Sequence, residues 1–336
     1  MVERRWDGPL SWFRLQRLAG RSRTVDLELD FDRLDPEIAA LIPTLPPGLA
    51  NLTQDSVVAL REALTANAAP PPPTDIEITE HAVPSPAGDV PVFIHRRPSD
   101  EIQPCLLWIH GGGYIFGSAQ DLRATWIAEN LDLTVVSIDY RLAPEHPFPA
   151  GTEDCFAALQ WAAEHAADLK IDPTRLAIGG ASAGGGMAAG LALMNRDRGG
   201  PPVAFQLLIY PMIDNLHDTP SGQYTNHPVW CRQTSFNAWE MYLGGTPGKE
   251  ASPYACAARA TDLSGLPPAY VCVGAEDLFR DEDIDYARRL IAAGVPCELS
   301  VYPGLFHGAD GFMPGAKISQ RLERGYQAAL AHALGL

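Results

Sequence analysis

The chain has 336 residues, of which 46 % are hydrophobic and 20 % are charged. This length and balance supply enough apolar surface for a large core, which excludes a disordered or collagen-like chain. Acidic residues outnumber lysine and arginine by 41 to 25, and the net charge of −16 argues against nucleic acid as a partner.

Residues 1–73 differ in character from the rest of the chain. Their start is rich in Trp and Arg, a helical pattern follows at residues 54–64, and prolines at 70–73 stop any helix and stiffen the backbone. We predict an N-terminal region joined by a proline linker to a main domain at 74–336. The basic start is either a membrane-surface or targeting helix or, as we prefer, a helix packed over that domain with its arginines in solvent. It has no apolar stretch long enough for a signal peptide, so we expect a cytoplasmic protein.

Short apolar runs alternate with helical patterns after the prolines. Strands are expected at residues 76–83, 90–96, 106–109, 133–138, 176–178, 205–210, 270–273 and 298–302. Helices are expected between most of them, at residues 153–167, 183–194, 283–293 and 318–334. Strands buried on both faces and separated by helices predict a mostly parallel sheet of about eight strands with helices on both faces.

Two further segments bear on this architecture. Residues 176–195 carry no charge over the length of a membrane span, but six glycines favour a strand, a sharp turn and a helix. Residues 214–262 contain no obvious strand and are expected to cover the carboxyl edge of the sheet, where such folds bind ligands. The six cysteines form no C-x-x-C pair, and we expect all of them to be free, with Cys105, Cys272 and Cys297 in buried strands.

The clearest chemical signal is Gly-Ala-Ser-Ala-Gly at residues 180–184, directly between an apolar strand and a Gly/Ala-rich helix. A G-x-S-x-G in this context predicts a tight turn that presents Ser182 as a nucleophile at a helix N-terminus. On its own, the motif is also compatible with a plain tight turn.

A second signal is the sequence His-Gly-Gly-Gly at residues 110–113, which follows a predicted strand. Glycines let backbone N–H groups turn toward a ligand, and together with the N–H of Ala183 they predict an oxyanion hole. The alternative is a flexible loop. We expect His110 itself to be structural.

A serine nucleophile on such a sheet requires an acid and then a histidine later in the chain. His307 follows the last predicted strand, and Asp277 follows the penultimate one. Glu276 is the next candidate for the acid, and Asp281 and Asp283 lie nearby.

Five ordered motifs together resemble the hormone-sensitive-lipase-like (family IV) carboxylesterases of the α/β-hydrolase fold. They are residues 110–113, Asp-Tyr-Arg-Leu-Ala-Pro-Glu at 139–145, the Ser182 turn, Asp-Leu-Phe-Arg-Asp-Glu at 277–282 and Phe-His-Gly at 306–308. The resemblance covers about residues 76–336. It implies a Ser182, His307, Asp277 triad, oxyanion donors from Gly111, Gly112 and Ala183, and residues 139–145 as a brace behind the oxyanion loop.

The resemblance also implies a helical cap, built from residues 1–73 and part of 214–250, over a catalytic domain at 74–336. Two positions depart from the family pattern. Ala181 precedes the nucleophile where Asp or Thr is usual, and Ala309 follows Gly308 where Phe is common. These departures leave the subfamily and the pocket shape open.

The expected activity is therefore hydrolysis of short-to-medium acyl or aryl esters through an acyl-enzyme. The alternatives are an amidase or lactonase with the same triad and a non-catalytic small-ligand receptor on the same fold. Candidate pocket residues are Trp12, Phe13, Trp230 and Trp239. Without H-E-x-x-H, a P-loop or a dinucleotide fingerprint, no metal or organic cofactor is expected. By resemblance alone, we allow for a homodimer.

Overall fold

The computed structural model describes residues 27–45, 52–66, 72–245, 248 and 250–336. Its centre is a single eight-stranded sheet in the order β1-β2-β4-β3-β5-β6-β7-β8. The pairs β1–β2 and β2–β4 are antiparallel, and the remaining neighbours are parallel. The predicted mostly parallel α/β sheet is thus confirmed.

All eight predicted strands are present, with ends that move by a few residues. They are β1 (Glu77–Val83), β2 (Val90–Arg96), β3 (Gln103–Ile109), β4 (Thr134–Ile138), β5 (Ile171–Ala181), β6 (Phe205–Ile209), β7 (Ala269–Gly274) and β8 (Cys297–Tyr302). Strands β3, β4, β6 and β7 are buried along their whole length. This burial on both faces explains why their sequences are continuous apolar runs.

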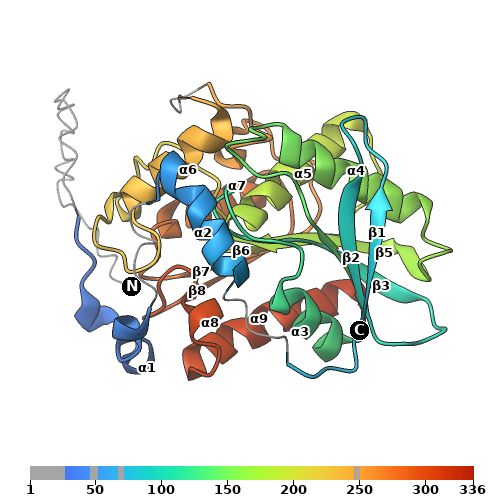
Figure 1. The fold of residues 1–336 in the computed structure, drawn as a ribbon, viewed down its shortest axis with the longest axis horizontal. Coiled ribbons are helices and arrows are strands. Elements are labelled where there is room, and N and C mark those ends of the chain that lie inside the picture. Colours follow the sequence, from blue (N-terminus) through green and yellow to red (C-terminus); the bar gives the residue numbers. More distant parts are fainter. Residues whose placement is uncertain (1–26, 46–51, 67–71, 246–247, 249) are drawn as a thin grey trace, which may run out of the picture.

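Helices cover both faces of this sheet (Figure 1). The helices in the described ranges are α1 (Pro36–Ala39), α2 (Gln54–Ala66), α3 (Leu122–Leu131), α4 (Ala150–Glu164), α5 (Ala183–Arg198), α6 (Arg232–Leu243), α7 (Arg280–Ala292), α8 (Ala309–Phe312) and α9 (Lys317–Leu334). Helices α3 and α9 pack together on one face, and α4 and α5 pack together on the other.

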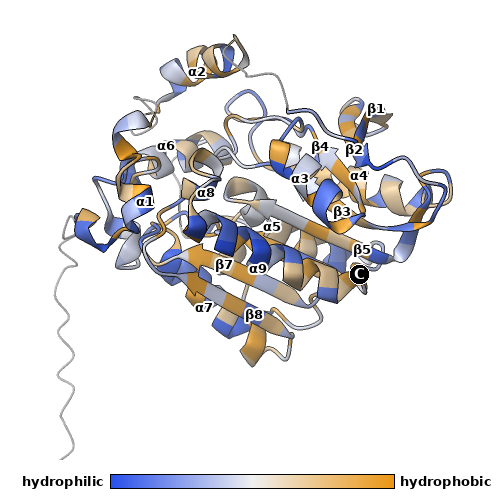
Figure 2. Cartoon of the chain, turned by 90° about the horizontal axis from the view of Figure 1, so that it is seen from below, coloured by the Kyte–Doolittle hydropathy of each residue, from blue (hydrophilic) through white to orange (hydrophobic). Residues whose placement is uncertain are grey.

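Helix α9 shows how sequence periodicity positions these layers. Its buried apolar residues recur every four positions, at Ile318, Leu322, Tyr326, Leu330 and Leu334. Such spacing makes one apolar stripe on a helix, and that stripe packs on β6 and β7. In Figure 2 the strand β7 is mostly orange, whereas the part of α9 in front of it is largely blue.

One strand differs from expectation. Cys105 and Cys272 are buried as predicted, but Cys297 is partly exposed, because β8 lies at the edge of the sheet. All six cysteines are free. Within the described ranges, no helix is both long and apolar enough to cross a membrane.

The parallel strands point their carboxyl ends toward the same edge of the sheet. Strand β3 ends just before His110, β5 just before Ser182, and β7 just before the loop that contains Asp277. Helix α2 and the segment containing α6 lie at this edge (Figure 1). The fold therefore brings the candidate residues to one place.

Candidate active site

Ser182 occupies a sharp turn between β5 and α5. Its backbone has φ 57° and ψ −121°, a strained conformation for a residue with a side chain. The turn is held in place because the Ser182 N–H donates to the Ile209 carbonyl (2.9 Å), and its own carbonyl accepts from Gly186 and Met212 (both 2.9 Å). Small neighbours are required, since a Cβ at Gly180 or Gly184 would overlap main-chain atoms.

The three predicted triad residues meet in one hydrogen-bonded chain. Ser182 Oγ lies 2.8 Å from His307 Nε2, and His307 Nδ1 lies 2.9 Å from Asp277 Oδ2. The other oxygen of Asp277 accepts the N–H of Phe279 at 2.9 Å. Asp277 is fully buried, so its carboxylate is fixed in place and screened from solvent.

The imidazole of His307 is also held by aromatic contacts. Tyr210 and Phe279 approach it edge-on, with ring centroids 4.9 and 4.8 Å away. These contacts fix the ring plane while leaving both nitrogens to their polar partners. Sequence reasoning missed both aromatic residues, because nothing in the local pattern indicates contact with a residue far along the chain.

His227 is a second histidine at the site that the sequence did not reveal. The backbone N–H of His307 lies 3.2 Å from its Nε2, and that of Trp230 lies 3.1 Å from its Nδ1. Burial lowers the pKa of His227 to about 3, so the ring is neutral near pH 7 and accepts through one nitrogen at a time. His227 therefore connects the pocket segment at Trp230 to the loop of His307.

The other carboxylates considered for the triad do not contact His307. Glu276 pairs with Arg33 at 2.9 Å, and Asp281 pairs with Arg280 at 2.8 Å. Asp283 is fully buried, and burial raises the pKa of this carboxyl well above its usual value. Of the four candidates, only Asp277 lies against the imidazole.

The glycine loop after β3 lies beside Ser182. Gly112 and Gly113 have φ of 115° and 61°, which glycine adopts without strain. Ala183 is the first residue of α5, so its N–H stands outside the helical ladder of hydrogen bonds. Gly111, Gly112 and Ser182 line one cavity, so two of the three expected oxyanion donors and the nucleophile lie around the same space.

The segment at residues 139–145 contacts the back of this loop. The Tyr140 hydroxyl donates to the His110 carbonyl at 3.0 Å, and the two rings stack with centroids 4.3 Å apart. The Ala143 N–H donates to the Tyr114 carbonyl at 3.0 Å. His110 is buried in this packing, and its Nδ1 lies 2.8 Å from the Gly111 carbonyl oxygen.

The cavity above Ser182 has a volume of about 290 Å³. Most of its wall is apolar, and α2 contributes two leucines. Its lining residues are Leu60, Leu64, Gly111, Gly112, Gly113, Phe116, Asp121, Arg123, Ala181, Ser182, Tyr210, Val229, Trp230, His307, Gly308 and Phe312.

Of the four aromatic residues expected in the pocket, Trp230 lines this cavity, with its indole packed against Gly113. Trp239 does not line it. Its side chain is fully buried and packs on Tyr114 and Tyr242, with centroids 5.1 and 5.9 Å away, because it lies on the core-facing side of α6. Trp12 and Phe13 lie outside the described residues.

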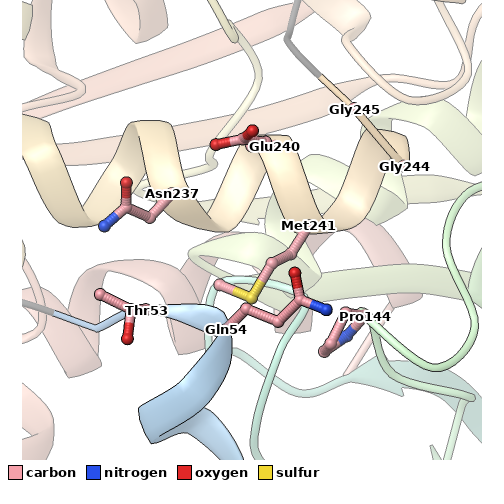
Figure 3. A pocket seen from close by; sticks show the side chains of 8 residues that line it. All are labelled: Thr53, Gln54, Pro144, Asn237, Glu240, Met241, Gly244 and Gly245. Atoms are coloured by element: carbon pink, nitrogen blue, oxygen red, sulfur yellow. The ribbon is translucent and has the colours of Figure 1, made fainter.

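A second cavity, of about 410 Å³, lies between α2 and α6 (Figure 3). Figure 3 shows Gln54 beside Met241, with Asn237 and Glu240 along α6. None of the described histidines or cysteines lines this cavity. Among the described residues, no group of three or more His, Cys, Asp or Glu side chains is arranged to hold a metal ion.

The site combines a strained serine between strand and helix, a histidine after the last strand and a buried aspartate after the penultimate strand. This combination defines a serine hydrolase. The comparisons agree with this class. A family model described as alpha/beta hydrolase fold matches residues 106–310.

Curated relatives from Mycobacterium tuberculosis include carboxylesterase NlhH, 42 % identical over 62 % of this chain and 67 % of its own length. Carboxylic ester hydrolase LipN is 36 % identical over 86 % of this chain and 79 % of its own length. Among solved structures, a bacterial heroin esterase is 37 % identical, with a TM-score of 0.83 over 90 % of this chain and 99 % of that one. The chain belongs to the α/β-hydrolase family, in its hormone-sensitive-lipase-like branch.

Proposed function

We propose that this protein is a serine carboxylesterase that hydrolyses short-to-medium acyl or aryl esters through an acyl-enzyme. The observation that carries the proposal is the hydrogen-bonded chain from Ser182 through His307 to Asp277, opening into an apolar cavity. Relatives whose names describe carboxylic ester hydrolysis support the choice of ester over amide or lactone.

In this mechanism, Ser182 Oγ attacks the ester carbonyl carbon while His307 Nε2 takes the hydroxyl proton. The Asp277 carboxylate accepts from Nδ1–H, which keeps Nε2 free of a proton and stabilises the imidazolium that forms. The imidazolium then gives its proton to the leaving alcohol. Water repeats the sequence at the acyl-enzyme, releasing the acid and restoring Ser182.

Negative charge develops on the carbonyl oxygen during both steps. We assign the N–H groups of Gly111, Gly112 and Ala183 as donors to that oxyanion, assisted by the N-terminus of α5. One such donor contributes about 10²- to 10³-fold in rate. The turn at Ser182 supports this assignment, because the nucleophile and the Ala183 N–H are adjacent at the N-terminus of α5.

The substrate range follows from the cavity. A volume of about 290 Å³ with leucine, phenylalanine and tryptophan walls suits a short or medium apolar group. We assign residues 74–336 as the catalytic domain and residues 1–73 with part of 214–250 as its cap. Leu60 and Leu64 of α2 support this assignment, because they line the same cavity as Ser182.

The test is the variant Ser182→Ala. We expect hydrolysis of p-nitrophenyl butyrate to fall by about 10⁴-fold or more, because the nucleophile is lost. Labelling by a fluorophosphonate should occur in the wild type and be absent from the variant, which separates an enzyme from a ligand receptor. Near-wild-type turnover by the variant would overturn the proposal. Rates across acyl lengths test the substrate range, and a maximum at C16 would contradict it.

A further inference from the structure

A buried guanidinium lies in the wall of the mostly apolar cavity that Ser182 and His307 also line. It belongs to Arg123 on α3, whose side chain is 11 % exposed. Its Nη2 donates to Asp310 Oδ2 at 2.7 Å, and the other oxygen of Asp310 accepts from the Tyr210 hydroxyl at 2.9 Å. The Tyr210 ring in turn packs against the His307 ring, with centroids 4.9 Å apart and an interplanar angle of 72°.

The guanidinium has more donors than these neighbours can accept. Arginine carries five N–H groups in a planar fork. Within the described part of the chain, Asp310 and the Tyr210 hydroxyl are the acceptors beside it. Asp121 also lines the cavity, but its two oxygens accept from Trp108 Nε1 and the Arg123 backbone N–H, each at 3.0 Å. N–H groups of Arg123 therefore remain to bind an oxygen that enters the cavity.

The surrounding charge decides which kind of oxygen fits. Asp310 already balances the charge of the guanidinium, and Asp121 adds a second carboxylate nearby. The whole chain carries a net charge of −16. An entering carboxylate would be repelled by these groups and would lose its hydration. An uncharged ether, hydroxyl or keto oxygen accepts the same N–H at a smaller desolvation cost.

We propose that Arg123 forms a polar subsite in this cavity and selects esters that carry a further uncharged oxygen in the acyl or alcohol group. The proposal rests on the esterase function above and deepens it. Arg123 acts here as a specificity-determining residue, separate from the three residues of the triad.

Matched substrates that differ by one CH₂ replaced by O test this subsite. On the acyl side the pair is p-nitrophenyl pentanoate and p-nitrophenyl 3-methoxypropanoate. On the alcohol side it is butyl acetate and 2-methoxyethyl acetate. The quantity measured is the ratio of kcat/KM within each pair. This ratio cancels any general loss of activity, including one caused by movement of Tyr210 and His307.

The double variant Arg123→Met/Asp310→Asn removes both charges together, so that neither remains buried alone. We expect the ratio in favour of the oxygen-bearing ester to fall about tenfold in at least one pair, the loss typical of a hydrogen bond to a charged group. The control Arg259→Met/Asp214→Asn removes an ion pair that does not line the cavity, and should keep the wild-type ratio.

Equal ratios in the wild type and the Arg123 double variant, for both pairs, would overturn the proposal. So would a wild-type preference for the p-nitrophenyl monoester of glutaric acid over the 3-methoxypropanoate, since that indicates a carboxylate site. Should the double variant fail to fold, Arg123→Lys decides in the same way, because it keeps the charge and loses the fork. Absence of hydrolysis of every ester, with no fluorophosphonate labelling of Ser182, would instead overturn the esterase function itself.

Discussion

Replacing Asp277 by asparagine tests the proposed triad with little change in shape. Asp277 makes two hydrogen bonds, one oxygen to the Phe279 N–H and the other to His307 Nδ1, both at 2.9 Å. The amide oxygen of Asn can keep the bond to Phe279. Its NH₂ group then faces His307, where it donates to Nδ1 and shifts the ring proton to Nε2. The imidazole can no longer accept the proton of Ser182.

The expected loss follows from this change of tautomer. In a serine protease, the equivalent change lowers kcat by about 10⁴-fold, or roughly 5.4 kcal/mol of transition-state stabilisation. The free energy of unfolding should change much less, because the buried bond to Phe279 is preserved. Steady-state kinetics with p-nitrophenyl butyrate and urea unfolding measure the two effects separately.

The matched control is Glu276→Gln, at the neighbouring position. Glu276 pairs with Arg33 and does not contact His307, so kcat should stay within a few-fold of the wild type. If Asp277→Asn kept more than a tenth of the wild-type kcat, Asp277 would not be the residue that orients His307. If Glu276→Gln lost as much activity as Asp277→Asn, the assignment of the acid would be wrong.

Two further predictions concern the glycine loop and a buried histidine. In Gly113→Ala, the new Cβ would overlap the indole of Trp230, and alanine would have to adopt the positive φ of Gly113. We therefore expect kcat/KM for p-nitrophenyl butyrate to fall at least tenfold. Unchanged kinetics would refute this prediction. His217 is fully buried between Phe236 and Phe279, and burial lowers its pKa to about 3. Between about pH 6.5 and 3 the unfolded chain binds a proton here that the folded chain does not, so acid destabilises the fold. The substitution His217→Phe should therefore raise the free energy of unfolding, relative to the wild type, by about 2 kcal/mol more at pH 5 than at pH 7.5. Urea unfolding at the two pH values measures this difference. An equal change at both pH values would contradict the lowered pKa of His217.

The sheet was predictable because its strands are buried on both faces. Short continuous apolar runs bounded by turns, such as those of β3 and β7, are typical of strands buried on both faces. The sequence also narrowed the triad candidates, since strand ends and chain order limit which histidine and which carboxylate reach the serine.

The pocket wall could not be predicted in the same way. Trp230 and Trp239 are nine positions apart in one insertion, yet one lines the cavity and the other is buried in the core. Their difference depends on how α6 packs, which no local pattern encodes. His227 and the pair of Arg123 with Asp310 depend likewise on contacts between distant segments.

The attachment of α2 has a consequence for engineering this enzyme. Its Arg61 donates from Nε to the Ile115 carbonyl at 2.7 Å, just past the glycine loop, and pairs with Glu145 at 2.7 Å. The helix that lines the cavity is thus tied to the backbone that follows the proposed oxyanion donors. A chimera that exchanges residues 54–66 to alter substrate choice would also disturb the turnover chemistry, unless the grafted helix brings a guanidinium to the same place.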